Sequence, residues 1–250
     1  MLISISKLRL FKSCRRAYEL KYIENLEPIK RADALEIGLN YHSKIEDIYN
    51  NGYCDVMDDS MESAMALAYE KYIYPHFKVQ AVEDWVRYKL NDKHTLVGRI
   101  DGMTIDNCLV EHKTCSVNLD EYEYGLQWDE QILAYMLATG ARKIYFTLVK
   151  KPTIRRKKNE SSEDFFNRMC KWYDEDTHDK IRVVELTRTD KEVEDFKYEL
   201  IRMCEEMETE NYYKNTSYCN HWGRLCEYAS ICLNYDPDIE YVDFERREFK

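Results

Sequence analysis

The sequence predicts an α/β sandwich with a mixed central sheet. The chain has 250 residues, which is enough for one large domain with a buried core. Segments of helical period come first, three runs of strand character follow, and helices then alternate with two further strands. This order favours a sheet flanked by helices. We find no internal repeat and no low-complexity segment.

Three helices are expected before the first strand. The first covers residues 4–23 and starts at Ser4 or Ser6. The third covers residues 60–75 and ends at Pro75. The second covers residues 33–50, where five residues recur near one face at steps of three and four: Leu35, Leu39, His42, Ile45 and Tyr49.

Strands and helices alternate in the rest of the chain. The strands are expected at residues 82–90, 94–105, 108–114, 143–149 and 181–186. The helices are expected at residues 122–140, closed by Gly140 as a C-cap, at 161–173, and at 190–210 after the capping residue Thr189.

We expect these elements to form one domain over residues 1–250. Its parts are an N-terminal helical part (1–80) that carries Cys14 and His42, a core (81–210) with a polar insertion (150–180), a cysteine-containing segment (211–235) and an exposed tail (236–250).

The charge balance is acidic, with 37 Lys and Arg against 47 Asp and Glu and a net charge of −10. Affinity for a phosphate backbone comes largely from Lys and Arg, so this average does not favour nucleic acid. The basic residues are nevertheless clustered, either as a solvated loop or as a patch that follows a nucleic-acid backbone. The clusters are Lys150, Lys151, Arg155, Arg156, Lys157 and Lys158, and Arg15 and Arg16 beside Cys14.

The cysteine content and the apolar pattern indicate a reducing compartment. Nine cysteines, an odd number, argue against a secreted disulfide framework and favour a metal site. No stretch approaches membrane-spanning length, and the N-terminus lacks the pattern of a signal peptide. We therefore expect a cytoplasmic protein.

The most informative residues are Asp101, Glu111 and Lys113. Two carboxylates can hold a hard divalent cation through their oxygen atoms. Such a cation polarises a phosphate and lowers the pKa of a bound water. A lysine ammonium can orient that water or stabilise the charge that builds on the phosphate. Acid, acid and lysine at this spacing therefore predict a metal-dependent phosphodiesterase, whereas the alternative is a surface hairpin with ordinary solvated charges.

The hairpin register decides whether these carboxylates meet. Glu111 and Lys113 lie two apart on a strand and point to the same face. A two-residue turn at Asp106-Asn107 would direct Asp101 away from Glu111. A shared site therefore requires a three-residue loop or a bulge, for which Gly102 is a plausible place.

Three more residues are candidates for the same site. His42 is either a satisfied core histidine or a third metal ligand. Gln131 and Tyr135 are four apart on a helix and project side by side. They are either ordinary helix positions or hydrogen-bonding groups directed at a DNA backbone or at Lys113.

Four of the cysteines form a possible quartet, namely Cys14, Cys219, Cys226 and Cys232. A thiolate quartet can hold an iron–sulfur cluster or zinc, and the alternative is reduced cysteines without metal. A metal held in this way would tie the two ends of the chain together. Cys219 is the least certain ligand, and His221 is a nearby replacement. The other five cysteines are scattered and are interpreted as structural.

The ordered motifs resemble the PD-(D/E)XK nuclease superfamily, in particular the RecB-like group with the AddB nuclease domain and the CRISPR-associated RecB-like exonucleases. The resemblance covers residues 4–235, and such stand-alone proteins occur in phage genomes. The motifs are Cys14-Arg15-Arg16-x-Tyr18, Gly38-x-x-x-His42, Gly98-Arg99-Ile100-Asp101-Gly102, Glu111-His112-Lys113-Thr114, Gln131-x-x-x-Tyr135 and the three late cysteines.

The resemblance implies a restriction-endonuclease-like core and a role for each motif. His42, Asp101 and Glu111 would bind Mg²⁺ or Mn²⁺ together with the backbone carbonyl of His112, and Lys113 would be catalytic. Gln131 and Tyr135 would contact DNA near the active site. The four cysteines would hold a [4Fe-4S] cluster, with zinc as the fallback, although the gaps of six and five residues between the late cysteines depart from the usual pattern.

The expected function is a metal-dependent DNA exonuclease that acts on single-stranded DNA or on ends, with DNA contacts from Arg15, Arg16, Arg155 and Arg156 as well. Recombination, repair and CRISPR-adaptation-like processing are the possible settings, with a recombination or CRISPR-adaptation protein as a possible partner. The alternative is a non-catalytic DNA-end-binding or adaptor protein with the same fold.

Overall fold

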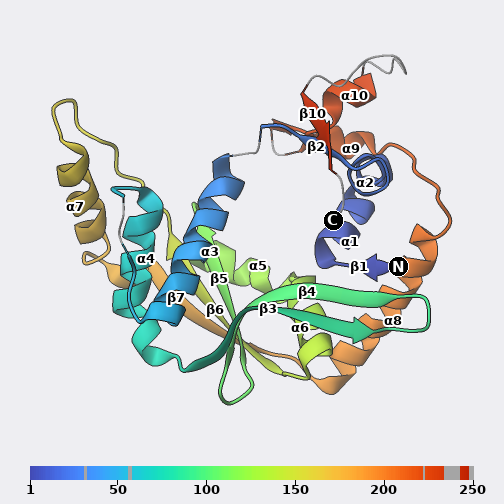
Figure 1. Cartoon of the computed structure of the whole chain (residues 1–250), viewed down its shortest axis with the longest axis horizontal. Helices are drawn as coiled ribbons and strands as arrows, with labels where there is room; N and C mark the ends of the chain where they lie inside the picture. The colour runs from blue at the N-terminus through green and yellow to red at the C-terminus, as the bar shows by residue number, and fades with distance from the viewer. Residues whose placement is uncertain (31–32, 56–57, 222, 234–242, 248–250) are drawn as a thin grey trace. The chain divides into compact units, whose positions relative to one another are not determined.

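The computed structural model describes residues 1–30, 33–55, 58–221, 223–233 and 243–247 (Figure 1). The chain divides into two compact units. Unit 1 comprises Met1–Ala32, Lys89–Leu96 and Lys197–Lys250, and unit 2 comprises Asp33–Tyr88 and Val97–Phe196. In the described part of the chain, no helix is long and apolar enough to cross a membrane.

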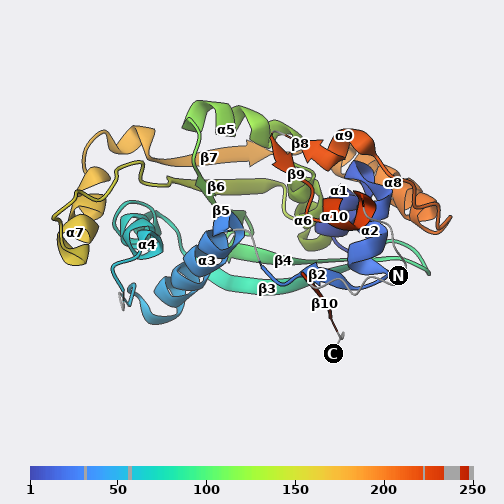
Figure 2. The same cartoon turned by 90° about the horizontal axis from the view of Figure 1, so that it is seen from above.

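A mixed six-stranded sheet is the centre of the fold, as predicted. Its order is β1-β4-β5-β6-β7, and β3 also pairs with β4. β1 is parallel to β4, β4 and β5 are antiparallel, β5 and β6 are parallel, and β6 and β7 are antiparallel. Figure 2 shows β6 and β7 side by side. The strands are β1 (Leu2–Ile3), β3 (Val79–Lys89), β4 (Thr95–Thr104), β5 (Leu109–Cys115), β6 (Lys143–Lys150) and β7 (Ile181–Thr187).

The core of unit 2 lies between the sheet and two helices, α3 (Asp33–Asn51) and α4 (Met61–Tyr72). The buried stripe of α3 is Tyr41, Ile45 and Ile48, and each large apolar side chain removed from water contributes about 1.5–3 kcal/mol. The expected stripe is partly wrong, because Leu35 and Leu39 are 55 % and 50 % exposed. In the first turns of α3, Ile37 packs partly buried against this core, and full burial begins at Tyr41.

Two of the expected helices are each divided into two. Residues 4–23 form α1 (Ile5–Ser13) and α2 (Arg15–Tyr22), separated by Cys14 in an extended conformation. Residues 122–140 contain the end of α5 (Leu119–Gly125), the 3₁₀ turn η2 (Leu126–Trp128) and α6 (Glu130–Thr139). The side chain of Asp129 accepts a hydrogen bond from the backbone N–H of Gln131, because aspartate at an N-cap competes with continuous helix.

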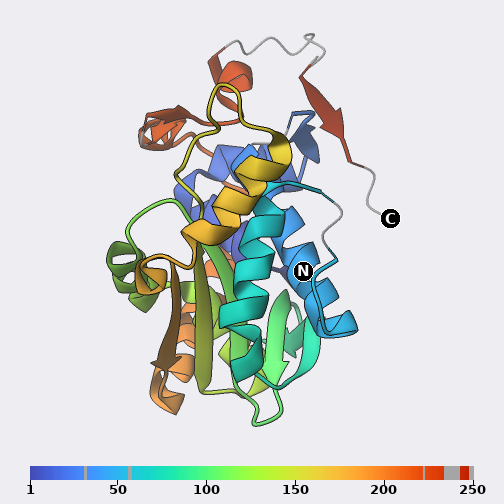
Figure 3. The ribbon, with the colours of Figure 1, turned by 90° about the vertical axis from the view of Figure 1, so that its left-hand side faces the viewer.

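The remaining helices of the core agree with the prediction. α6 ends at Gly140, which has the left-handed φ of +78° of a C-cap. Pro75 lies in the short turn η1 (Tyr74–His76) just beyond α4. The insertion carries α7 (Ser162–Trp172), which packs beside α4 (Figure 3), and the turn η3 (Thr177–Asp179) precedes β7. α8 covers Asp190–Met207.

Unit 1 contains short elements where irregular structure was expected. β2 (Leu26–Pro28) pairs with β10 (Phe244–Arg246), and β8 (Asn220–His221) pairs with β9 (Arg224–Leu225). Two short helices, α9 (Thr216–Cys219) and α10 (Ala229–Leu233), lie near them in sequence. Of the expected tail at 236–250, residues 236–242 and 248–250 lie outside the described residues.

Candidate active site

The β4–β5 hairpin brings the two predicted carboxylates to the same place. Gly102 pairs with Val110 and Met103 with Leu109, so continuation of the register sets Asp101 opposite Glu111. The backbone N–H of Thr104 donates to the carbonyl of Cys108 at 2.8 Å, which leaves three residues in the loop. Asn107 supplies the left-handed φ of +60° that this loop requires. The three-residue alternative is therefore the one observed.

Asp101 is buried in a charged environment. Its side chain accepts a hydrogen bond from the backbone N–H of His112 at 2.7 Å. Burial, and after it the negative charge of Glu111, raise the pKa of Asp101 to about 8, although His42 and Lys113 oppose the shift. Two carboxylates held together inside a protein are unfavourable unless a cation lies between them. This pair is therefore suited to bind a cation.

Lys113 lies on the same face as Glu111. Its Nζ atom is 2.5 Å from Oε1 of Glu111. Burial alone would lower the pKa of Lys113, but the charges of Glu111 and Asp101 outweigh burial and hold the pKa above its usual value. The side chain is therefore an ammonium group at neutral pH, which suits it to stabilise negative charge rather than to accept a proton.

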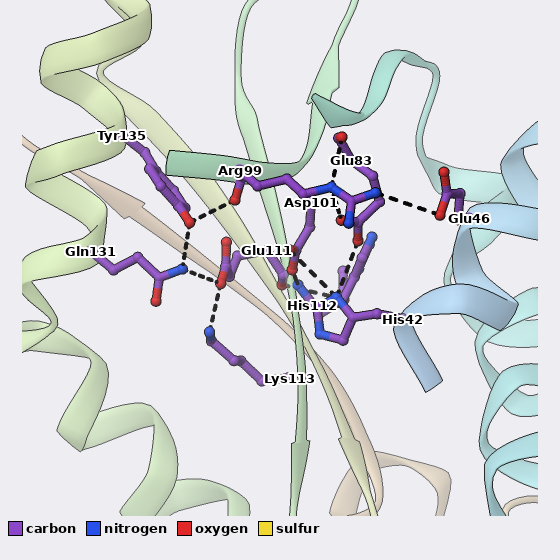
Figure 4. Close-up of polar contacts among 11 residues, drawn as sticks. His42, Glu46, Glu83, Arg99, Asp101, Glu111, His112, Lys113, Gln131 and Tyr135 are labelled. Atoms are coloured by element: carbon purple, nitrogen blue, oxygen red, sulfur yellow. Dashed lines mark hydrogen bonds and ion pairs between the residues drawn. The ribbon is translucent and has the colours of Figure 1, made fainter. Parts of the chain in front are cut away.

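His42 joins the site from α3 together with a residue that the sequence did not reveal, Glu83 of β3. One ligand atom each from His42, Glu83 and Asp101 lie within 4.8 Å of one another. Nδ1 of His42 is 3.3 Å from Oε1 of Glu83 and 3.5 Å from Oδ1 of Asp101 (Figure 4). One imidazole nitrogen and two carboxylates form a donor set that suits a hard divalent cation.

A bulge in β3 directs Glu83 toward this site. Lys78 bonds to Ile105 at one end of the β3–β4 hairpin, and Leu90 bonds to His94 at the other. Lys78 and Leu90 are 12 positions apart along the β3 side (90 − 78), whereas their partners Ile105 and His94 are 11 apart along the β4 side (105 − 94). β3 therefore has one extra residue. Glu83 has a φ of +50°, which is rare for a residue other than glycine.

Gln131 and Tyr135 bind to the protein itself in this structure. Nε2 of Gln131 donates to Oε1 of Glu111 at 2.8 Å and lies 2.9 Å from the hydroxyl of Tyr135. That hydroxyl donates to the carbonyl oxygen of Arg99 at 2.6 Å. A Cβ atom at Gly98 would lie 2.7 Å from Cε1 of Tyr135, so the close approach of α6 to β4 requires glycine here. The pair thus holds Glu111 in position.

The imidazole of His112 lies on the opposite face of β5. Its Nδ1 atom is 2.7 Å from the hydroxyl of Thr147, and its ring contacts those of Tyr49 and Tyr69. Burial lowers the pKa of His112 well below its usual value, so the ring is neutral. Of the groups of His112, only those of the backbone face the carboxylates.

No contact that the structure describes links the four predicted DNA-binding arginines to the carboxylates. Arg15 and Arg16 belong to unit 1 and form ion pairs there with Glu206, Glu19 and Glu24. Arg155 and Arg156 lie in the exposed segment before α7. The backbone carbonyl of Arg155 accepts a hydrogen bond from Arg168, and Nε of Arg156 donates to the carbonyl of Glu160.

The four predicted cysteine ligands belong to unit 1. The β8–β9 hairpin closes the long gap between two of them, because the backbone N–H of Cys226 donates to the carbonyl of Cys219 at 2.9 Å. Cys14, Cys226 and Cys232 pack against one apolar cluster that includes Leu20 and Tyr228. The structure therefore brings these thiols into one neighbourhood.

The thiols are spaced more widely than one zinc ion requires. Burial, followed by the charges of neighbours that include Cys14 and Cys232, raises the pKa of Cys226. No three of the four thiols lie within 4.8 Å of one another in the part of the chain that the structure describes. Sulfur atoms around a tetrahedral zinc are about 3.8 Å apart, given Zn–S bonds of about 2.3 Å.

Comparison with known proteins identifies the family. The model of the PD-(D/E)XK nuclease superfamily matches residues 2–73 and 57–233. The chain belongs to the PD-(D/E)XK nuclease superfamily. No curated protein sequence matches it.

Three solved structures are similar to this chain at low sequence identity, and the first of them shares its fold. A protein from Eubacterium rectale described as a candidate exonuclease is 11 % identical, with a TM-score of 0.54 over 92 % of this chain and 87 % of that chain. SSO0001 is 13 % identical, with a TM-score of 0.47 over 93 % and 86 %. The alkaline exonuclease from Laribacter hongkongensis is 13 % identical, with a TM-score of 0.41 over 83 % and 88 %.

Proposed function

We propose that this protein is a metal-dependent DNA exonuclease. The observation that carries the proposal is the convergence of His42, Asp101, Glu111 and Lys113 in unit 2, with both carboxylates buried. Two buried carboxyl groups, one of them with a raised pKa (Asp101), beside an imidazole and a lysine are typical of a hydrolytic metal site. Superfamily membership and the E. rectale fold relative support the same assignment.

The side chains have distinct tasks in phosphodiester hydrolysis. His42, Asp101 and Glu111 would hold a Mg²⁺ or Mn²⁺ ion with the carbonyl of His112, and Glu83 adds a further carboxylate. When bound, the ion polarises the phosphate and lowers the pKa of a bound water. Lys113 stabilises the charge that develops on the phosphate oxygens. Gln131 and Tyr135 fix the orientation of Glu111 so that the oxygen ligands stay in place.

The proposed substrate is single-stranded DNA or a DNA end. Processing of DNA in recombination, repair or CRISPR-adaptation-like reactions is the setting that the motif set favours. The basic segment at 150–158 would follow the DNA backbone, because Arg155, Arg156, Lys157 and Lys158 are exposed.

We also propose that Cys14, Cys219, Cys226 and Cys232 hold a [4Fe-4S] cluster in unit 1. The packing of Cys14, Cys226 and Cys232 against one apolar cluster supports the proposal. Protein purified without oxygen should be brown, and Cys226→Ser should remove the visible absorbance. Cys170→Ser should keep the colour, because Cys170 packs in a different cluster. A colourless protein that contains stoichiometric zinc would contradict the cluster.

A gel assay tests the nuclease proposal. Single- and double-stranded DNA, labelled at either end, is incubated with Mn²⁺, Mg²⁺ or EDTA. Metal-dependent shortening by the wild type, lost in Lys113→Ala, is expected. Lys143→Ala is the matched control, since Lys143 lies on β6 and pairs with Glu185 at 2.9 Å. DNA binding without turnover by a folded wild-type protein would instead identify an end-binding adaptor.

A further inference from the structure

Arg99 is an exposed cation beside the metal ligands. It lies on β4 two residues before Asp101, so both side chains point to the same face. Its Nε atom donates to the carbonyl of Glu83 at 2.9 Å and lies 3.0 Å from Oε2 of the same residue, which in turn contacts His42 (Figure 4). Its Nη2 atom is 3.9 Å from Glu46. Glu83 thus aligns the guanidinium at the edge of the site.

The carboxylates of the site would repel a phosphate unless an exposed cation lies beside them. The ammonium of Lys113 is engaged by Glu111 and is only 22 % exposed, whereas the side chain of Arg99 is 47 % exposed. A phosphate that approaches the buried carboxylates must meet positive charge at the rim. A guanidinium has five N–H donors, and its planar fork matches two phosphate oxygens. The contacts described above leave donors of Arg99 for such a ligand.

An exposed indole lies across the hairpin from Arg99. Trp85 is five positions before Leu90, and Arg99 is five positions after its partner His94. The count from this end of the hairpin therefore sets Trp85 opposite Arg99, on the same face of the sheet. The side chain of Trp85 is 66 % exposed. A large aromatic ring left in water next to a phosphate-binding cation is the arrangement that binds a nucleotide.

We propose that Arg99 and Trp85 form a binding step for one unpaired nucleotide of a single-stranded nucleic acid, with Arg99 on a phosphate and Trp85 stacked on the base. The inference deepens the proposed nuclease function and rests on it. An unpaired base offers a free face for the indole, whereas bases inside a duplex already stack on one another. The step would hold a frayed strand beside the metal ligands.

Binding in the absence of cleavage tests this step. Lys113→Ala protein in EDTA is titrated with a fluorescent single-stranded oligonucleotide at several salt concentrations. The double variant Lys113→Ala/Arg99→Gln should bind roughly tenfold more weakly than the Lys113→Ala parent. The plot of log affinity against log salt should also become less steep by about 0.7, the value for one phosphate on a single strand. The double variant Lys113→Ala/Trp85→Ala should bind more weakly by a similar factor, as expected for loss of one stacked base, with the salt dependence of its affinity unchanged.

Two matched variants and one altered ligand control the test. Arg142→Gln and Trp128→Ala should bind like the parent. Arg142 is 39 % exposed and paired with Asp190, and Trp128 matches Trp85 in exposure, at 65 %, but lies in η2 rather than on β3. An oligonucleotide that lacks bases should bind the Trp85→Ala and parent proteins equally. Arg99→Lys and Trp85→Phe should each recover part of the lost affinity.

The outcomes separate this inference from the nuclease proposal. Unchanged affinity and salt slope in both Arg99→Gln and Trp85→Ala would overturn the binding step. An equal loss of affinity for duplex DNA would overturn the assignment to a single strand. A wild-type protein that binds through these residues but cleaves nothing in the gel assay would contradict the nuclease function and leave the binding step intact.

Discussion

The site depends on how single residues balance charge. Asp101 and Glu111 come within reach of His42 and Lys113, and each cation is already engaged by a carboxylate. Glu83 adds a third negative group and links His42 to Arg99. Without a metal ion, the negative charge of this site is only partly compensated, so the residues that serve function reduce the stability of the metal-free protein.

Asp101 makes the stability of the metal-free protein fall as pH rises. An unfolded aspartate has a pKa of about 3.9, whereas the folded value is about 8. Between these values the folded state keeps a proton that the unfolded state has lost, so stability is lost as pH rises toward 8. Asp101→Asn should therefore raise the free energy of unfolding in EDTA at pH 8 by about 1–3 kcal/mol.

Urea unfolding at pH 5 and pH 8 checks this prediction. The gain should be smaller at pH 5, and Mn²⁺ should stabilise the wild type but not Asp101→Asn. Asp92→Asn is the control, because that side chain is 97 % exposed. A variant that is less stable than the wild type at pH 8 in EDTA would show that the buried charge is not a cost.

Glu83 gives a second prediction at the residue scale. Its carboxylate lies near both His42 and Asp101, so Glu83→Gln should weaken Mn²⁺ binding roughly tenfold, the lower range for groups that support a metal site. Calorimetric titration measures the affinity. Glu46→Gln should bind Mn²⁺ like the wild type, since the ion pair of Glu46 among the described residues is with Arg99. Equal affinities in Glu83→Gln and wild type would remove Glu83 from the metal site.

At the scale of elements, the docking of α6 on β4 positions the strand that carries Asp101. Gly98 permits the approach of Tyr135, whose hydroxyl joins Gln131 and Arg99. Gly98→Ala should destabilise the protein by about 1–3 kcal/mol through overpacking and lower activity by displacing Gln131 from Glu111. Thermal unfolding and the gel assay measure the two effects.

Gly125→Ala is the matched control for this prediction. A Cβ atom at Gly125 meets nothing within 4 Å, and its φ of −64° is helical. Alanine there should stabilise the protein by about 0.4–1 kcal/mol. Similar stability and activity in Gly98→Ala and wild type would mean that the close approach of α6 to β4 is not needed.

The sequence predicts elements better than their irregularities. The alternation of β4 and β5 predicts the common face of Glu111 and Lys113, and Gly140 predicts the end of α6 because only a left-handed cap fits there. The extra residue in β3 interrupts the alternation of side chains, so Glu83 could not be assigned to a face, although two adjacent acids in an apolar strand, Glu83 and Asp84, were a signal. The loop length depended on the conformation of Asn107, which spacing alone does not determine.

At the scale of the whole molecule, unit 1 joins segments from both ends of the sequence. Residues 1–32 and 197–250 share this unit, and the four cysteines come from both segments. Their apolar cluster includes Leu26 and Tyr228, whose hydroxyl donates to the carbonyl of Leu26 at 2.9 Å. The residues of the proposed metal site, His42, Glu83, Asp101 and Glu111, all belong to unit 2.

Tyr228→Ala should loosen both segments of unit 1 together. Tyr228 is fully buried, and loss of such a ring costs about 3–5 kcal/mol. Hydrogen exchange should increase in residues 5–28 and in 216–233, while amides of β5 and β6 stay protected and Mn²⁺ binding remains. Faster exchange confined to residues 216–233 would show that the two segments do not unfold as one unit.

The most direct test of the account is calorimetric titration of Mn²⁺ into the wild type and Glu111→Gln. Glu111 is 2 % exposed and lies with Gln131 and Lys113 in the proposed metal site, and Glu121→Gln, exposed in the same unit, is the control. We expect Mn²⁺ binding by the wild type and by Glu121→Gln, and at least tenfold weaker binding by Glu111→Gln. Equal Mn²⁺ affinity in Glu111→Gln and wild type, with both proteins folded, would contradict the proposed metal site.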